Sequence, residues 1–151
     1  MNRRRFLVAS AGGLASSAIP ALAQRFQPPQ DVAPLIDQLT GGATPEARGI
    51  EIGLPQLAEN GNSVPLHVKV ASAMSADDRV EAVHVIAPRN PRPLVATFHF
   101  GPGAARAEVS TRMRLAGTQK VVVLARLSGN RWLVGDYEVL VTSAACLDES
   151  V

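Results

Sequence analysis

The sequence is short of the residues on which several functional classes depend. Its 151 residues include one cysteine, so no disulfide bond can form within the chain, and one cysteine with three histidines is too few for a zinc finger. Aromatic residues make up 4% of the chain, which is too few for the stacking surfaces of nucleic-acid-binding domains. The 46% of hydrophobic residues is nevertheless enough for the core of one compact domain.

Motifs of the common enzyme classes are also absent from the sequence. There is no G-x-S-x-G motif, and the acidic residues show no pairing that would indicate a glycosidase. Gly101-Pro102-Gly103 is not followed by a helical pattern or a phosphate-contacting lysine, so it predicts a turn rather than a nucleotide-binding loop. We therefore expect neither an autonomous enzyme nor a cofactor of the chain's own.

The N-terminus has the pattern of an export signal. Arg3-Arg4-Arg5 precedes a mildly apolar run that ends in Ala21-Leu22-Ala23, which has the form of a signal-peptidase site. Glycines, serines and Pro20 interrupt the run, so it is a poor membrane-spanning helix and predicts no stable membrane anchor. We interpret residues 1–23 as a twin-arginine-type signal peptide, which predicts a periplasmic protein.

Most of the positive charge belongs to this signal. The whole chain has a formal net charge of +2, but removal of three arginines leaves 12 basic residues against 13 acidic ones. A chain of nearly neutral charge has no electrostatic footprint for nucleic acid, so we expect no nucleic-acid partner.

The rest of the chain predicts a short helix followed by a β domain. In the lead-in, residues 24–49, Asp31 is a candidate cap for a helix that ends before Gly41-Gly42, and we expect this helix to cover a sheet edge or an open end of the core. Alternating or apolar segments then occupy residues 50–54, 64–70, 83–86, 94–100, 107–115, 120–125 and 132–142. This pattern favours an all-β, immunoglobulin-like antiparallel sandwich over residues 50–142, with a barrel as the alternative.

Three histidines fall on predicted strands. His67, His84 and His99 have no metal-ligand spacing, so ordinary strand histidines are favoured over a metal site. A periplasmic metal chaperone built on histidine and methionine nevertheless stays open as an alternative.

The single cysteine lies in the C-terminal segment 143–151, after the last predicted strand. Cys146 is placed to leave the domain, because four extended residues after Thr142 reach about 13 Å. We call residues 143–151 the C-terminal arm. An incidental unpaired cysteine is the alternative interpretation.

Several short motifs in order give the sequence a family resemblance. They are Leu54-Pro55, Ala58-Glu59-Asn60-Gly61, Val64-Pro65, Asn90-Pro91-x-Pro93, Ser110-Thr111-Arg112-Met113-Arg114-Leu115-Ala116 and Val141-Thr142-x-x-x-Cys146. Together they resemble the SoxY family, the sulfur-carrier proteins of bacterial thiosulfate oxidation.

The resemblance implies a function for Cys146. SoxY proteins are similar in being immunoglobulin-like, exported by the twin-arginine route and bound to a SoxZ subunit, and they carry sulfur covalently on the cysteine of a Gly-Gly-Cys-Gly-Gly arm. Carried over to Cys146, this predicts a covalent carrier rather than an enzyme, with haem and metals on the partner enzymes. A thiol suits this task because it forms persulfides reversibly.

The arm departs from the family pattern. Ala144-Ala145 stand in place of the first two glycines and Leu147-Asp148 in place of the last two, and Glu149 adds further negative charge. A SoxY-like subunit that binds partners but carries no sulfur is therefore an alternative hypothesis. Candidate partner surfaces are the apolar helix face at Leu35 to Leu39 and the strand from Arg112 to Arg114.

Overall fold

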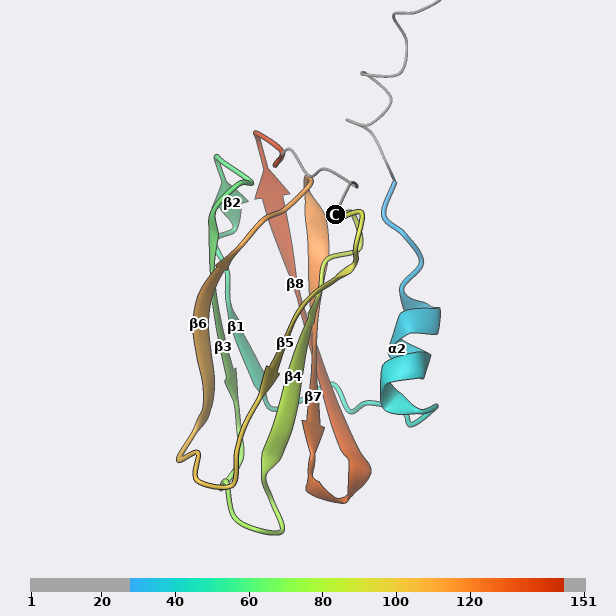
Figure 1. Cartoon of the computed structure of the whole chain (residues 1–151). Coiled ribbons are helices and arrows are strands. Elements are labelled where there is room, and N and C mark those ends of the chain that lie inside the picture. The colour runs from blue at the N-terminus through green and yellow to red at the C-terminus, as the bar shows by residue number, and fades with distance from the viewer. Residues whose placement is uncertain (1–27, 146–151) are drawn as a thin grey trace, which may run out of the picture.

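The alternating segments of the sequence form the strands of two β-sheets. The structure, a computed structural model, describes residues 28–145 (Figure 1). Its elements are α2 (Ala33–Thr40), β1 (Ile50–Gly53), β2 (Leu57–Ala58), β3 (Val64–Val70), β4 (Val80–Ile86), β5 (Leu94–His99), β6 (Ala107–Met113), β7 (Gln119–Leu127), the 3-10 turn η3 (Ser128–Asn130) and β8 (Arg131–Val141).

The two sheets pack face to face as a sandwich. The first has three antiparallel strands in the order β1-β3-β6, and the second has five strands in the order β2-β8-β7-β4-β5. Within the second sheet, the short β2 runs parallel to β8 and the other pairs are antiparallel. This arrangement confirms the predicted sandwich, and the barrel alternative is wrong.

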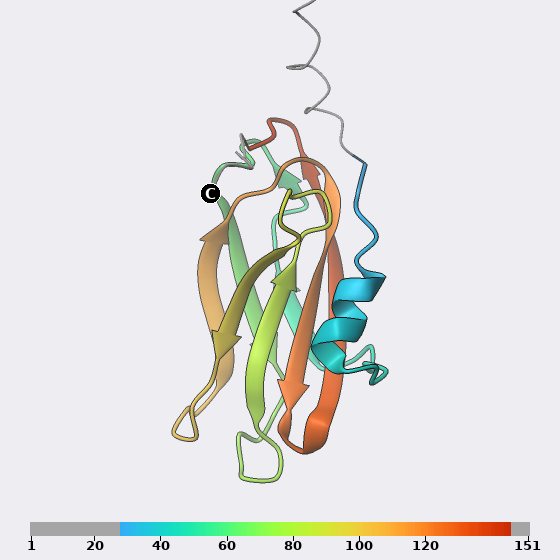
Figure 2. The same cartoon turned by 45° about the vertical axis from the view of Figure 1, so that its right-hand side comes forward.

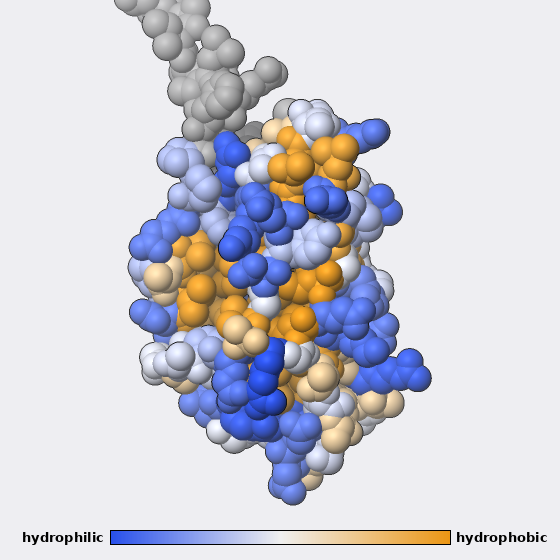
Figure 3. All heavy atoms as spheres, turned by 180° about the vertical axis from the view of Figure 1, so that it is seen from behind, coloured by the Kyte–Doolittle hydropathy of each residue, from blue (hydrophilic) through white to orange (hydrophobic). Residues whose placement is uncertain are grey.

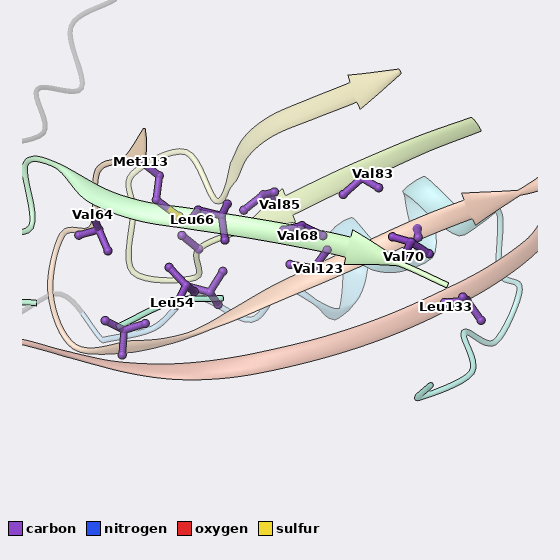
Figure 4. Packing of buried hydrophobic residues seen from close by; sticks show 14 of the residues in the cluster. Leu54, Val64, Leu66, Val68, Val70, Val83, Val85, Met113, Val123 and Leu133 are labelled. Atoms are coloured by element: carbon purple, nitrogen blue, oxygen red, sulfur yellow. The ribbon is translucent and has the colours of Figure 1, made fainter. Parts of the chain in front are cut away.

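The core lies between the sheets and comes from the inward face of each strand. Along β3, every second side chain is at most 4% exposed, from Val64 to Val70. These side chains meet Val83, Val85 and Val123 of the five-stranded sheet (Figure 4). Period-two alternation therefore places one face of each strand in the core and the other in solvent, as expected for a sandwich.

Helix α2 packs on the outer face of the five-stranded sheet (Figure 2). Its side chains contact Ile86, Leu124 and Trp132, which are at most 4% exposed. The expectation that the helix covers an edge or an open end is therefore wrong. The outer faces of β4, β7 and β8 are apolar and need cover, and the helix supplies it.

The same contact corrects one candidate partner surface. Leu35, Ile36 and Leu39 are partly buried against this sheet, so the apolar helix face is occupied by the chain itself. Only the C-terminal end of the helix follows the sequence prediction, because Gly41 adopts a left-handed φ of 64°. At the other end the N-cap residue is Val32 and not Asp31, whose Oδ1 accepts a hydrogen bond from Ala33 N at 3.0 Å from one residue earlier.

One turn was predicted from the sequence and one short strand was not. Gly101-Pro102-Gly103 forms the predicted turn, whereas β2 was not predicted, because its two residues are too few to show alternation. Within residues 28–145, no helix is long and apolar enough to cross a membrane.

Candidate functional site at the root of the C-terminal arm

Cys146 lies outside the described residues, and so do the predicted signal peptide and residues 147–151 of the C-terminal arm. The structure does describe the first three residues of the arm, Ser143 to Ala145, which adjoin the cysteine directly. The residues that hold this root form the described part of the candidate site.

A set of backbone hydrogen bonds holds the root of the arm. Gly61 N–H donates to the carbonyl of Ser143 at 2.7 Å, and Leu115 N–H donates to the carbonyl of Gly61 at 2.8 Å. Ala145 N–H in turn donates to the carbonyl of Leu115 at 2.9 Å. We call these four residues, Gly61, Leu115, Ser143 and Ala145, the anchor.

Gly61 occupies a place in the anchor that no other residue fits. A Cβ atom on Gly61 would lie 2.4 Å from the Leu115 carbonyl oxygen, 2.8 Å from Ala145 N and 3.0 Å from the Ser143 carbonyl oxygen. All three neighbours are backbone atoms, so relief requires movement of the main chain. The sequence shows Asn60-Gly61 as a turn signal, but a glycine needed for close backbone approach gives the same signal, so its role was missed.

The chain before Gly61 runs alongside the end of β8. Leu140 N–H donates to the carbonyl of Gln56 at 2.9 Å, and Thr142 N–H donates to the carbonyl of Ala58 at 3.1 Å. The Thr142 hydroxyl donates to the carbonyl of Glu59 at 3.0 Å. These bonds hold the chain as far as Thr142 beside β2, so the root of the arm starts from an ordered end of the sheet.

Asn90 joins a second loop to the same end of the sandwich. Its side chain is 5% exposed. Its Nδ2 donates to the carbonyl of Arg114 at 2.9 Å, and its Oδ1 accepts from Ala116 N at 3.0 Å. Because Arg114 and Ala116 flank Leu115, Asn90 holds the chain on both sides of the residue that binds Ala145.

The short motifs of the sequence therefore converge in space. Ala58 to Gly61, Asn90, Leu115 and Val141 to Ala145 come from four separate motifs, and hydrogen bonds join them at the end of the sandwich that carries the arm. The spacing of these motifs along the chain did not predict this convergence. It depends on tertiary contacts between loops, which leave no periodic signal.

The reach estimated for the cysteine has to be corrected. The estimate counted residues 143–146 as extended. Ser143 and Ala145 belong to the anchor, Ala144 lies between them in the sequence, and Ala145 is only 8% exposed. Residues 143–145 are therefore not a free extended segment, and the estimate of about 13 Å, which assumed that they were, does not hold for them.

Two exposed leucines lie beside the root of the arm. Leu57 and Leu140 are 52% and 47% exposed and are register partners in the β2–β8 pair. Figure 3 shows apolar surface at the upper end of this face, where β2 lies. A molecule that approaches the root from this side meets an apolar surface.

The three histidines do not converge. His67 lies on β3 of the three-stranded sheet, whereas His84 and His99 lie on β4 and β5 of the other sheet. Among residues 28–145, no group of three histidine, cysteine, aspartate or glutamate residues is arranged to hold a metal ion. The residues described here give no support to a metal chaperone.

His84 instead has a structural environment. Its ring stacks on Trp132 with centroids 5.8 Å apart, and its Nδ1 lies 3.0 Å from Thr97 Oγ1. Burial lowers the pKa of the His84 imidazole below its ordinary value, and the positive charges of Arg126 and His99 lower this pKa further. The neutral form is therefore favoured in the folded protein.

Sequence reasoning found no hydrolase triad, yet one polar row contains the corresponding residue types. His67 Nδ1 lies 2.9 Å from Ser110 Oγ, and His67 Nε2 lies 3.4 Å from Glu108 Oε1. His67 and Ser110 are register partners across β3 and β6, with Glu108 two residues along on the same face. Cross-strand pairing accounts for this row, which is partly exposed on the outer face of the three-stranded sheet.

The arginine-bearing strand is polar, as expected, and one of its arginines has a partner within the chain. Arg112 Nε donates to Ser63 Oγ at 2.6 Å, next to the turn that contains Gly61. Arg114 is exposed, while its carbonyl is bound by Asn90. The strand therefore supports the end of the sandwich where the anchor lies.

Comparison with known proteins identifies the family. The family model for the sulfur oxidation protein SoxY matches residues 36–146. The structure is similar to that of the sulfur carrier protein SoxY from Chlorobium limicola f thiosulfatophilum, with a TM-score of 0.61 and 30% identity over 72% of this chain and 90% of that one. No curated protein sequence matches the chain.

More distant structural similarities concern the fold alone. The superoxide reductase (neelaredoxin) from Ignicoccus hospitalis has a TM-score of 0.55 and 14% identity, over 62% of this chain and 80% of that one. A putative superoxide reductase from Thermotoga maritima has a TM-score of 0.54 and 14% identity, over 64% and 87%. The family match spans the sandwich, the anchor and Cys146, and the chain therefore belongs to the SoxY family of sulfur oxidation carrier proteins.

Proposed function

We propose that this protein is a periplasmic sulfur carrier that holds thiosulfate-derived sulfur covalently on Cys146 and presents it to partner enzymes. The observation that carries this proposal is the convergence of the family's motifs on the anchor, one residue before the cysteine. An incidental cysteine would give no reason for four motifs to meet at its root.

The proposed chemistry uses the thiol as an attachment point. The Cys146 thiolate and thiosulfate form a new S–S bond while a haem-containing partner accepts two electrons. Water then cleaves the bond to the terminal sulfonate, which releases sulfate and two protons and leaves a persulfide on the cysteine. The carrier supplies the thiol to which the sulfur of thiosulfate is attached, and the partners supply the catalytic groups.

The proposal includes partners and a location. We infer a SoxZ-like subunit as the heterodimer partner, because the family implies a Sox complex, and we assign the other steps to periplasmic sulfur-oxidation enzymes. The export pattern of residues 1–23, with Arg3-Arg4-Arg5 before an apolar run, supports the periplasm. A twin-arginine signal would allow this chain to cross the membrane already folded.

Loading of radiolabelled thiosulfate tests the proposal. Wild-type protein and the Cys146→Ser variant are compared in cells that oxidise thiosulfate, and protein-bound label is measured before and after reductant. We expect reductant-labile label on the wild type and none on the variant, with both proteins folded and equally abundant. Equal labelling of the two proteins would contradict a carrier role for Cys146.

A subunit that binds partners but carries no sulfur is the second candidate. It is favoured by Asp148 and Glu149, whose negative charges lie close to the cysteine in the sequence and disfavour both a thiolate and an approaching anion. It predicts that the wild type remains unlabelled in cells where another carrier is loaded.

A further inference from the structure

We propose that Gly61 is a positioning residue that fixes where Cys146 leaves the sandwich, so that the thiol is presented on a short anchored lead. The inference rests on the proposed function in one respect only, that the thiol of Cys146 is the group delivered to partners. The anchor itself can be tested on protein that carries no sulfur.

Gly61 is the central member of the anchor because both of its backbone polar groups are used there. Its N–H binds the Ser143 carbonyl and its carbonyl binds the Leu115 N–H, at 2.7 and 2.8 Å. Leu115 is fully buried in the core, so this hydrogen-bonded set is fixed to the rigid part of the sandwich. Movement of the root therefore requires loss of several bonds together.

The requirement for glycine at residue 61 comes from space. A Cβ would lie 2.4 Å from the Leu115 carbonyl oxygen and 2.8 Å from Ala145 N, which are the two atoms that hydrogen-bond to each other. A methyl group on residue 61 therefore disrupts the bond next to the cysteine directly.

Ala145 carries the restraint up to Cys146. Its N–H is bound to the Leu115 carbonyl and the residue is 8% exposed. Alanine also has less backbone freedom than glycine, which favours a fixed root. Cys146 directly follows this anchored residue in the sequence, so we infer that a molecule that reacts with its sulfur approaches this end of the sandwich.

Gly61→Ala tests the anchor, with Gly103→Ala as the matched control. A Cβ on Gly103 would have no neighbour within 4 Å, and its φ lies outside the left-handed region. We expect the Ala145 amide to exchange with solvent slowly in the wild type and Gly103→Ala, and at least about tenfold faster in Gly61→Ala. The Val123 amide, in the centre of the five-stranded sheet, should exchange at the same rate in all three proteins.

A nitroxide spin label gives a second readout, because Cys146 is the sole cysteine and takes the label without further substitution. We expect the label to rotate at least about twofold faster in Gly61→Ala than in Gly103→Ala. An unprotected Ala145 amide in the wild type, or label motion that Gly61→Ala leaves unchanged, would overturn the proposal.

Transfer from partners separates positioning from simple stability. Iodoacetamide, a small reagent, should modify Cys146 in Gly61→Ala at least as fast as in Gly103→Ala. In thiosulfate-grown cells, the fraction of Cys146 with a sulfur adduct should fall at least about fivefold in Gly61→Ala, at equal protein level. Equal adduct fractions, with the Ala145 amide deprotected, would show that the anchor does not position the thiol.

A second variant tests the anchor if Gly61→Ala does not fold, and the readouts distinguish failure of the anchor from failure of the proposed function. If Gly61→Ala does not fold, Ala145→Pro replaces it, because proline removes the N–H that binds the Leu115 carbonyl and leaves glycine at residue 61. Faster label motion is again expected, and unchanged motion would count against the anchor. If the wild type carries no sulfur adduct, the proposed function fails, while amide exchange and label motion still decide whether the anchor exists.

Discussion

Gly61 donates its backbone N–H to the carbonyl of Ser143 at 2.7 Å, and this bond joins the loop before β3 to the segment that leads to Cys146. The bond explains why the root of the C-terminal arm is part of the domain. It also means that substitutions far from Cys146 in sequence should alter the behaviour of its thiol.

Asn90→Ala should destabilise the end of the sandwich that carries the anchor. The substitution leaves the carbonyl of Arg114 and the N–H of Ala116 without the partner that Asn90 provides. We expect a loss of about 2–4 kcal/mol in the free energy of unfolding, measured by urea denaturation. Asn62→Ala is the control, because its exposed side chain donates only to Asn60, and its effect should stay within about 0.5 kcal/mol. Equal effects would argue against the Asn90 network.

Leu124→Ala should weaken the packing of α2 on the sheet. Leu124 is fully buried beneath the helix with Trp132, so truncation leaves a cavity there. We expect a cost of about 2–5 kcal/mol in unfolding free energy and a red shift in the fluorescence of Trp132, the sole tryptophan. Leu94→Ala, at a residue already 36% exposed, should cost less than about 1 kcal/mol and leave the spectrum unchanged. An unshifted spectrum in Leu124→Ala would contradict the close contact between helix and sheet.

Stability should fall in mild acid because of His84. Its pKa is lowered in the folded protein, first by burial and then by Arg126 and His99, so the unfolded chain binds a proton more readily. The stabilisation from neutral His84 is fully present above its ordinary pKa of 6.5 and is lost as the pH falls from there towards the lowered folded value. His84→Gln should flatten this part of the stability curve, measured by urea denaturation across the window. A curve as steep as that of the wild type would show that another group is responsible.

Protein isolated without a histidine tag should contain no stoichiometric copper or zinc. His67 lies on the opposite sheet from His84 and His99, and the described residues contain no group of three potential ligands. We expect less than about one tenth of an equivalent by elemental analysis, since a lone histidine is a weak site. One equivalent that disappears in His84→Gln or in His67→Gln would revive the metal chaperone.

Most of the fold follows from local patterns in the sequence. The alternation from Val64 to Val70 and the apolar run in β7 identify strands because a sandwich buries one face of each strand. The placement of α2 does not follow, since its apolar face shows that it is covered without showing which surface covers it. Periodicity gives burial but not the identity of the partner surface.

The candidate site was only partly accessible to sequence reasoning. Position and family resemblance single out Cys146, but the sequence predicts a free arm before it, because Ser143 to Ala145 show no strand pattern. The anchor depends on backbone groups of Gly61 and Leu115, and every residue except proline carries such groups. Their meeting is a property of the tertiary structure, which no single motif records.

Intact-mass analysis of the mature protein from thiosulfate-grown cells tests the central claim most directly. The protein is measured with and without reductant, and the C-terminal peptide is then mapped. The account predicts sulfur adducts on Cys146 that reductant removes. An unmodified Cys146, in cells where another carrier is loaded, would contradict the carrier function and favour the subunit that binds partners without carrying sulfur.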